Sequence, residues 1–229
     1  MKNNINIFLQ ANHVSKKVKS GEDQLTILTD INLSITKSES IAILGASGSG
    51  KTTLLTLLAG LDSPTTGDIF LANYNLSILD EDARAKIRAR YVGFVFQSFQ
   101  LLPALTALEN VMLPLEIQNT PLRSAKQEAM DWLSKVGLEN RLHHYPLKLS
   151  GGEQQRVAIA RAFVGNRKII FADEMTGNLD NKTGNLISDL LFSLNETHQT
   201  TLVLVTHDEK LANRCRRQLI LNEGVLATC

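Results

Sequence analysis

The sequence of 229 residues lacks most features that mark a secreted, membrane-spanning or nucleic-acid-binding chain. It has only two cysteines, Cys215 and Cys229, at no metal or redox spacing, so a reducing, intracellular setting is expected. No apolar run approaches the roughly 20 residues of a membrane helix, and the start MKNNINIFLQ has no signal-peptide core. The net charge is +1, from 24 basic and 23 acidic residues, which gives no electrostatic reason to expect a nucleic-acid partner. We therefore expect a soluble globular chain.

Four short apolar runs predict the strands of a parallel sheet. They lie at residues 41–44, 91–96, 169–172 and 201–206. Nearly continuous apolar runs are typical of strands that are buried on both faces. The residues that follow these runs are Gly45, Gln97, the pair Asp173 and Glu174, and His207. Because ligands of open α/β sheets bind beyond the carboxyl ends of the strands, the four segments indicate one common site.

Other parts of the chain predict a β segment and helices. Residues 1–40 alternate apolar and polar positions on both sides of a polar turn at 20–22, which is typical of β-structure. Apolar residues recur at helical spacing in 51–60, which ends on a glycine, and in 124–138, which contains the only tryptophan. Strands that alternate with helices in this way indicate an α/β fold.

The stretch GASGSGKT at 45–52 matches the phosphate-loop pattern G-x-x-x-x-G-K-[ST], and it joins a predicted strand to a predicted helix. Its glycines let backbone N–H groups approach phosphate oxygens, Lys51 can reach the β- and γ-phosphates, and Thr52 offers a hydroxyl to Mg²⁺. By chance the pattern occurs in about one chain of this length in a hundred. We therefore predict that the loop and the residue after it bind a nucleoside triphosphate: Gly45, Ala46, Ser47, Gly48, Ser49, Gly50, Lys51, Thr52 and Thr53.

Two further stretches suit the same chemistry. IIFADE at 169–174 ends a predicted buried strand on Asp173, whose carboxylate can bind Mg²⁺, and Glu174 can polarise an attacking water. LSGGEQQRVAIARA at 149–162 places a serine and two glycines at the start of a predicted helix, where exposed N–H groups make an anion site. This second loop has no lysine, and the residues alone leave open whose phosphate it would bind.

Together these stretches resemble the ATP-binding-cassette (ABC) ATPases over essentially the whole chain. GASGSGKT, Gln97, LSGGEQQR, IIFADE, NLD at 178–180 and His207 occur in the order and spacing of that family. Finer detail is similar to its lipoprotein-release and macrolide-export branch, and within it to the YbbA-type exporter ATPases. The resemblance implies an α/β P-loop NTPase fold of the RecA-like class, with a mostly parallel sheet and an N-terminal antiparallel β part. It also implies a helical subdomain inserted at about 99–165 in a single domain of residues 1–229.

The resemblance also implies a role for each matching residue. In ABC ATPases two cassettes pair head to tail, and the signature loop of each caps the ATP on the phosphate loop of the other. The signature loop here is Ser150, Gly151, Gly152 and Glu153. The implied catalytic residues are Glu174 as general base, His207 on the γ-phosphate and Gln97 near the attacking water. Mg²⁺ would be held by Thr52, Gln97 and Asp173, and Asp180 would lie in the loop that crosses the dimer interface.

A membrane partner is implied as well. ABC ATPases of this branch form ATP-dependent homodimers that drive a separate integral membrane permease, which places the chain at the cytoplasmic face of the inner membrane. The stretch SFQLLPALTALENV after Gln97 would form the groove that receives the permease. Its apolar residues also suit an ordinary core, and the sequence does not decide between the two.

Three positions depart from the family pattern. Val18 stands where an aromatic residue usually stacks on the adenine, so weaker base contact and less selectivity between ATP and GTP are expected. Glu153 replaces the glutamine with which the signature is often written. Met175 replaces the proline that normally follows the general base, and it either relaxes that turn or simply fills the space.

Other classes of protein fit the sequence less well. A soluble ABC mechanoenzyme usually carries two cassettes, coiled coils or basic insertions, and this chain has one cassette and a balanced charge. A P-loop kinase would leave the LSGG loop, Gln97 and His207 without a task. A cassette that transmits force or a signal to a permease, without moving a substrate, would share the same residues and stays open.

Overall fold

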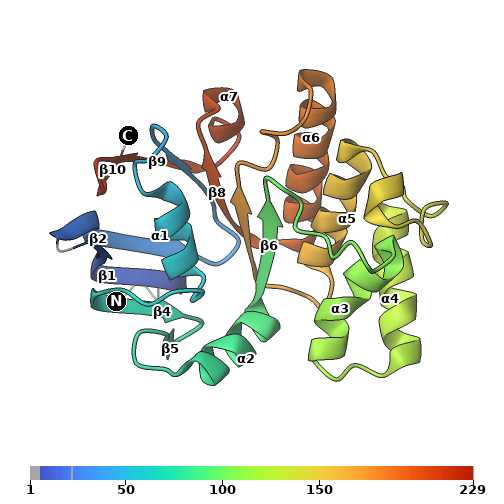
Figure 1. Cartoon of the computed structure of the whole chain (residues 1–229), viewed down its shortest axis with the longest axis horizontal. Helices are drawn as coiled ribbons and strands as arrows, with labels where there is room; N and C mark the ends of the chain where they lie inside the picture. Colours follow the sequence, from blue (N-terminus) through green and yellow to red (C-terminus); the bar gives the residue numbers. More distant parts are fainter. Residues whose placement is uncertain (1–5, 22, 229) are drawn as a thin grey trace. The chain divides into compact units, whose positions relative to one another are not determined.

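The computed structural model describes residues 6–21 and 23–228, and Figure 1 labels most of its elements. Glu22, at the predicted polar turn, and Cys229 lie outside these residues. The chain forms two compact units. The first comprises Met1–Arg88 and Thr201–Cys229, and the second comprises Ala89–Thr200.

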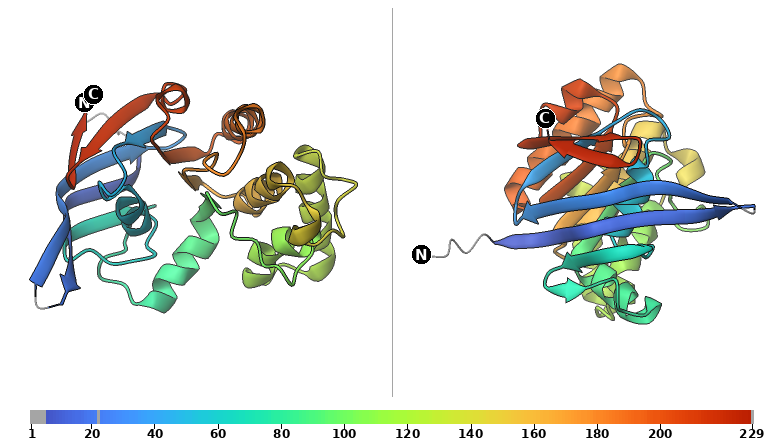
Figure 2. Two further views of the ribbon diagram at one scale, coloured as in Figure 1. Left: turned by 45° about the horizontal axis from the view of Figure 1, so that its top comes forward. Right: turned by 90° about the vertical axis from the view of Figure 1, so that its left-hand side faces the viewer.

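The first unit contains the predicted antiparallel β part. Its strands are β1 (Ile7–Ser20), β2 (Asp23–Thr36), β4 (Thr66–Leu71) and β5 (Tyr74–Asn75), in the order β2-β1-β4-β5. All neighbouring pairs are antiparallel. The two longest strands, β1 and β2, run side by side in the right-hand view of Figure 2. Their alternating pattern buries one face, with Leu9, Leu28 and Ile35 fully covered.

The same unit contains a second, mainly parallel group of strands that positions the phosphate loop. β3 (Ser40–Leu44) pairs in parallel with β8 (Thr201–Thr206) and with β9 (Arg217–Asn222), and β10 (Val225–Thr228) runs antiparallel to β9. Helix α1 (Lys51–Leu58) follows β3, and α7 (Glu209–Ala212) follows β8. Gly60 has a φ of 71° just past α1, which confirms it as the glycine that ends the helix. Helix α2 (Glu81–Tyr91) leads along the chain into the second unit.

The second unit combines two parallel strands with most of the helices. β6 (Val92–Phe96) pairs with β7 (Ile169–Asp173). Between them in sequence come α3 (Ala107–Ile117), α4 (Leu122–Lys135), the short 3-10 helix η1 (Pro146–Lys148) and α5 (Gly151–Phe163), and α6 (Asn181–His198) follows β7. Trp132 of α4 is buried, with its ring centre 5.6 Å from that of Phe163 on α5, so the only tryptophan fills core as predicted.

Two features of the structure bear on the setting of the chain. Over residues 6–21 and 23–228, none of the helices has the length and apolar character needed to cross a membrane. Cys215 is buried, and this burial raises the pKa of its thiol to about 12. At neutral pH the thiol is therefore protonated and unreactive.

Candidate functional site

The phosphate loop spans the turn between β3 and α1 in the first unit. Gly45 passes so close to β9 that a Cβ there would lie 2.3 Å from the carbonyl oxygen of Leu221, so no larger residue fits without movement. Gly50 is the N-cap of α1, with a φ of 99° and no side-chain cap. The first turn of α1 also contains no acidic residue. This helix start therefore suits an anion, because neither a side-chain cap nor an acid of the first turn uses its N–H groups and the positive end of its dipole.

Lys51 is the first residue of α1, and only 6% of it is exposed. Its Nζ donates to the carbonyl oxygens of Gly45 and Ala46, at 2.9 and 2.8 Å. The ammonium is therefore held over the loop itself. Phosphate oxygens that bind in the loop could replace these two carbonyls as acceptors, so the lysine is already near its working position.

The first unit also positions two other predicted site residues. His207 directly follows β8 and is exposed, and the next residue, Asp208, caps α7 by accepting from the N–H groups of Lys210 and Leu211. Val18 lies on β1 opposite Leu25 of β2, and both side chains are exposed. The aliphatic surface at Val18 offers contact area but no ring for stacking.

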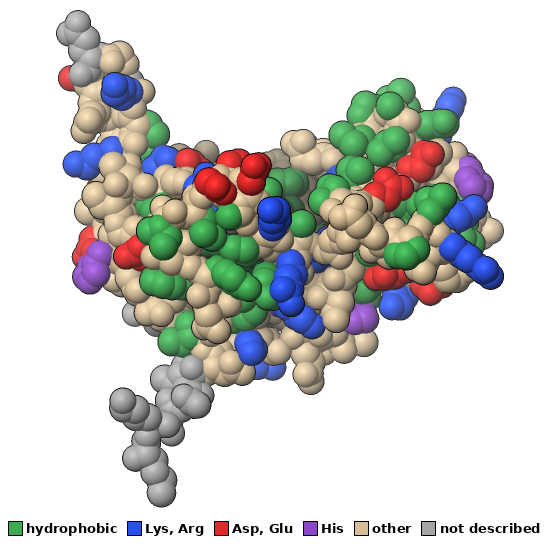
Figure 3. Space-filling view, turned by 90° about the horizontal axis from the view of Figure 1, so that it is seen from below, with side chains coloured by type: hydrophobic (Ala, Val, Ile, Leu, Met, Phe, Trp, Pro, Cys, Tyr) green, Lys and Arg blue, Asp and Glu red, His purple; other side chains and the backbone are tan. Residues whose placement is uncertain are grey.

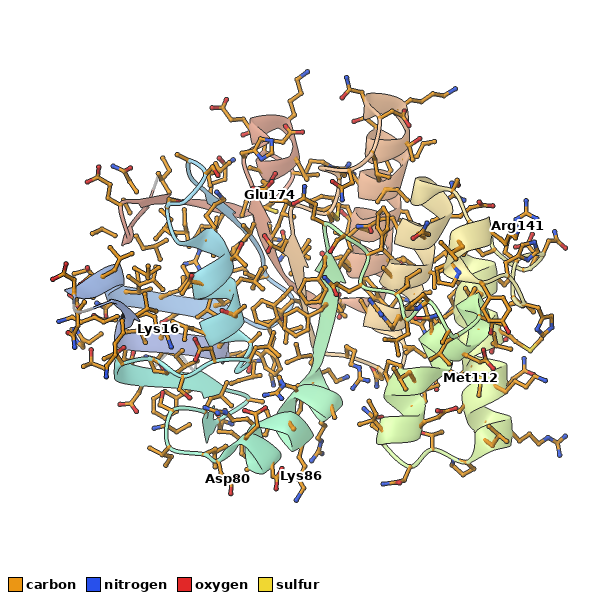
Figure 4. The ribbon with its side chains drawn as sticks, viewed as in Figure 1. Lys16, Asp80, Lys86, Met112, Arg141 and Glu174 are labelled. Carbon is orange, nitrogen blue, oxygen red and sulfur yellow. The ribbon has the colours of Figure 1, made fainter. Side chains whose placement is uncertain are left out.

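In the second unit, the two acidic residues mark the end of β7. Asp173 is the last residue of the strand, and Glu174 follows it with a φ of 41°, in the left-handed region that non-glycine residues rarely occupy. Figure 4 shows Glu174 beyond the end of the strand. A turn follows, in which the N–H of Gly177 donates to the carbonyl oxygen of Glu174 at 2.9 Å.

Residues behind this turn hold it in place. Met175 is fully buried, and its carbonyl oxygen accepts a hydrogen bond of 2.7 Å from Nε2 of Gln155 on α5. Gln155 is also fully buried. The methionine therefore fills core space, as the simpler of the two interpretations expected, and the backbone after Glu174 is fixed through the glutamine. Gln155 was not predicted for the site, although it lies within LSGGEQQR.

Gln97 is linked to the loop that follows Glu174. Its Nε2 donates to Oδ1 of Asn178 at 3.3 Å, and Nδ2 of Asn178 donates to the carbonyl oxygen of Gln97 at 3.0 Å. The two amides thus brace the end of β6 against the segment after β7. Asn178 is a second residue that was not predicted for the site, and the NLD motif was the signal that could have identified it.

The signature loop forms the capped start of α5. Ser150 is the N-cap, and it shares a capping box with Glu153, each side chain accepting from the backbone N–H of the other residue. A Cβ at Gly152 would lie 2.7 Å from Cγ2 of Thr183, in the first turn of α6. Asp180 caps that helix by accepting from the N–H groups of Lys182 and Thr183. The structure therefore brings the signature loop and the Asp180 loop together.

Hydrogen bonds lower the pKa of the capping carboxylate at both of these helix starts. The hydrogen bond from Arg141, then the backbone N–H of Ser150, lowers the pKa of Glu153 to about 2. Nε of Arg141 lies 2.9 Å from Oε1 of Glu153. Hydrogen bonds from Thr183 lower the pKa of Asp180. Both carboxylates are therefore charged at neutral pH. Arg141 was also missed, because nothing in the sequence marks it as a partner of Glu153.

The predicted Mg²⁺ ligands have suitable chemistry. Thr52 offers a hydroxyl, Gln97 an amide oxygen and Asp173 a carboxylate, and hard oxygen donors of this kind are those that Mg²⁺ binds. The described part of the chain contains no group of three or more His, Cys, Asp and Glu side chains that could hold a metal ion. A single carboxylate is nevertheless sufficient where substrate phosphates and water complete the Mg²⁺ shell.

Comparison with known proteins finds relatives that match this chain over nearly its whole length. A family model described as "ABC transporter" matches residues 28–177. The "Uncharacterized ABC transporter ATP-binding protein YbbA" of Escherichia coli (strain K12) is 53% identical over 218 residues, which are 95% of this chain and 96% of that protein. The "Lipoprotein-releasing system ATP-binding protein LolD" of Legionella pneumophila (strain Lens) is 47% identical over 220 residues, covering 96% of this chain and 97% of that protein.

The fold is similar to that of a solved cassette. The structure titled "Dimeric structure of a post-hydrolysis state of the ATP-binding cassette MJ0796 bound to ADP and Pi" superposes with a TM-score of 0.89 at 42% identity, covering 96% of this chain and 98% of that one. A second dimeric structure of MJ0796 gives the same values. This similarity confirms the predicted P-loop α/β fold class.

Proposed function

The chain belongs to the ABC transporter family of ATP-binding proteins, and we propose that it is the ATP-hydrolysing subunit of a transporter whose membrane permease is a separate protein. The observation that carries this proposal is the contrast between two helix starts. α1 begins without a side-chain cap and carries Lys51, whereas α5 begins with the capping box of Ser150 and Glu153 and carries no lysine. One start suits a phosphate that it neutralises itself, and the other suits a phosphate neutralised by another molecule.

Two copies of the chain would supply the two starts to one nucleotide. Pairing head to tail, each protomer holds ATP on its phosphate loop and presents Ser150, Gly151 and Gly152 to the γ-phosphate held by its partner. The dimeric MJ0796 structures support pairing of this kind. The close packing of the signature loop on the Asp180 loop supports it too, because both loops would face the same partner. ATP then joins the protomers and its hydrolysis releases them.

Hydrolysis needs a water, a base and a neutralised phosphate. Lys51 transfers its hydrogen bonds from the loop carbonyls to the β- and γ-phosphates, and the N–H groups at the start of α1 bind the same oxygens. Glu174 accepts a proton from the attacking water. The water oxygen bonds to the γ-phosphorus while the bond between the γ-phosphorus and the leaving oxygen of ADP breaks. Gln97 orients that water, and the Asn178 amide holds the glutamine in place. His207 contacts the γ-phosphate.

Thr52, Gln97 and Asp173 would hold Mg²⁺, which when bound neutralises charge on the β- and γ-phosphates. Val18 would lie against the base with an aliphatic surface in place of a ring. We propose that the whole chain acts as one cassette domain, with the helical part at about 99–165 carrying the signature loop and the permease contact.

The permease contact is proposed on the segment between Gln97 and α3. Its backbone is fixed, because Arg161 of α5 donates to the carbonyl oxygens of Phe99 and Gln100, at 2.7 and 2.5 Å. Asn110 of α3 donates to three more carbonyl oxygens of the segment, those of Leu102, Leu105 and Thr106, and accepts from the N–H of Leu102. Leu102 is nevertheless 45% exposed. The fixed backbone and the exposed leucine are compatible with a contact here, and the family resemblance of this segment is what supports it as the contact.

On the face shown in Figure 3, hydrophobic side chains lie among charged ones on the helical part, and further hydrophobic side chains lie on the rest of the chain. A permease bound to the segment between Gln97 and α3 would hold the chain at the cytoplasmic face of the inner membrane. The chain supplies the hydrolytic cycle, and the permease determines whether a substrate is exported or a force is transmitted.

Co-purification tests the proposal. A tagged Glu174→Gln variant, loaded with Mg-ATP to hold the closed dimer, is extracted from gently solubilised membranes, and the proteins bound to it are identified by mass spectrometry. We expect a polytopic permease with a large extracytoplasmic domain. Leu102→Asp in the same background is the matched control, and it should lose the permease while still binding ATP. Recovery of soluble partners alone would assign the chain to a soluble mechanoenzyme.

A further inference from the structure

The signature helix carries a charge that opposes its proposed task. Glu153 stands at the third position of α5, and its pKa of about 2 keeps it ionised at neutral pH. A carboxylate in the first turn uses the favourable end of the helix dipole and repels any further anion that approaches there. The phosphate loop avoids this conflict, because the first turn of α1 contains no acid.

The structure shows how the carboxylate is occupied. Oε2 of Glu153 accepts from the backbone N–H and from the hydroxyl of Ser150, at 2.8 and 2.9 Å. Oε1 accepts from Nε of Arg141 at 2.9 Å. Oε2 therefore orients the serine, and Oε1 binds the guanidinium of Arg141, whose positive charge lies next to the negative charge of the glutamate.

Arg141 is held in place for this contact. Its backbone N–H donates to the carbonyl oxygen of Leu138 at 2.9 Å, and its carbonyl oxygen accepts from the N–H of His144 at 3.0 Å. The same loop is attached to the first turn of α3, where the N–H groups of Ala107 and Leu108 donate to the carbonyl oxygens of His144 and Leu142. Figure 4 shows Arg141 at the outer part of the helical region, away from Glu174.

We infer that Arg141 is a positioning residue of the signature loop. It neutralises Glu153, so that the glutamate can fix the Ser150 hydroxyl while the start of α5 still accepts the γ-phosphate of the ATP on the partner protomer. This inference rests on the proposed two-chain site. Arg141 acts through Glu153 and Ser150, and it needs no contact with nucleotide.

Removing the guanidinium tests the inference. In the Glu174→Gln background, Arg141→Met leaves an uncompensated carboxylate beside the incoming phosphate. We expect the Mg-ATP concentration that gives half-maximal dimer to rise about fivefold, because the pair is partly exposed and screened by solvent. Light scattering measures the dimer. Binding of a fluorescent ATP analogue to the monomer should change by less than about twofold, since the phosphate loop is untouched.

A second substitution separates charge from structure. Glu153→Gln removes the negative charge but keeps an oxygen that can accept from Ser150. Adding Arg141→Met to Glu153→Gln should therefore change the half-maximal Mg-ATP concentration by less than about twofold, compared with about fivefold when Glu153 is present. Arg123→Met, an exposed arginine on α4, is the matched control and should change nothing.

The outcomes are distinguishable. If the Glu174→Gln parent does not dimerise with Mg-ATP, the proposed two-chain function is wrong. If the parent dimerises but Arg141→Met leaves the half-maximal Mg-ATP concentration unchanged, Arg141 does not act through the charge of Glu153. The same conclusion holds if Arg141→Met raises that concentration equally with and without the Glu153→Gln substitution. Thermal unfolding of each variant identifies a loss that is due to misfolding, and a purely structural loss would not be rescued by the glutamine.

Discussion

Replacing Gln155 by methionine is expected to weaken both the fold around Glu174 and the hydrolytic step. The Gln155 amide is buried and donates a hydrogen bond of 2.7 Å to the carbonyl oxygen of Met175. Met175 directly follows Glu174, whose φ of 41° is unfavourable for a non-glycine residue. The glutamine therefore holds the backbone immediately behind the proposed general base.

The size of the effect follows from burial. Methionine has nearly the same length as glutamine but no donor, so the Met175 carbonyl would lose this partner in a buried position. An unsatisfied buried acceptor costs about 1–3 kcal/mol. A loss of about 2 kcal/mol lowers the melting temperature of a chain of this size by roughly 4–8 °C. The backbone at Glu174 stores about 1–3 kcal/mol of strain, so it relaxes when the clamp is removed, and we expect kcat to fall about tenfold.

Three measurements test this reasoning. Thermal unfolding reports the loss of stability, steady-state phosphate release reports kcat, and a fluorescent ATP analogue reports binding, which should stay the same. Gln127→Met is the matched control: its amide is exposed on α4, bonded only to Asp131 among the hydrogen bonds described, so stability should change by less than about 0.5 kcal/mol. This role of Gln155 would be refuted if Gln155→Met had the same melting temperature as Gln127→Met and hydrolysed ATP at the wild-type rate.

Three further predictions follow from the site. Ser150→Arg should abolish ATP hydrolysis and spare ATP-analogue binding, because the bulky side chain blocks the partner's γ-phosphate; normal turnover would contradict a two-chain site. With Val18 in place of an aromatic residue, GTP should be hydrolysed within about threefold of the ATP rate, and strict use of ATP in the same phosphate assay would contradict this. The folded-state pKa of Glu153 lies at about 2, below its ordinary value of 4.5, so its contribution to stability is present above pH 4.5 and is lost as the pH falls towards 2. In urea unfolding, the stability difference between wild type and Glu153→Gln should shrink over that window, and a constant difference would show that the charge is irrelevant.

The regular elements could be predicted from the sequence because their signals are local. The apolar run at 169–172 corresponds to β7, and the run at 201–206 corresponds to β8. The helix predicted at 124–138 instead spans Leu122–Lys135. It ends earlier because Gly137 adopts a φ of 72°, while Val136 and Leu138 stay buried beyond the helix and continue the apolar pattern that suggested a longer one.

The supporting contacts of the site could not be predicted in this way. Gln97 and Asn178 are 81 positions apart, and Gln155 and Met175 are 20 apart, so only the folded chain brings each pair together. Motifs identify the residues that meet the substrate, because chemistry restricts their type. A supporting residue needs only a donor in the right place, and many sequences can supply one.

The starts of α1 and α5 are expected to control two different properties, the ATP affinity of one protomer and the ATP dependence of pairing. The phosphate loop is assembled within one protomer, with Lys51 already held over it by Gly45 and Ala46, so nucleotide binding requires little reorganisation. At the start of α5 the Ser150 hydroxyl bonds to Glu153, and the charge balance depends on Glu153 and Arg141. ATP affinity of the single protomer and ATP dependence of pairing are therefore set by different residues. In the proposed cycle hydrolysis reverses pairing, so substitutions at α5 should change the cycle while leaving nucleotide binding almost intact.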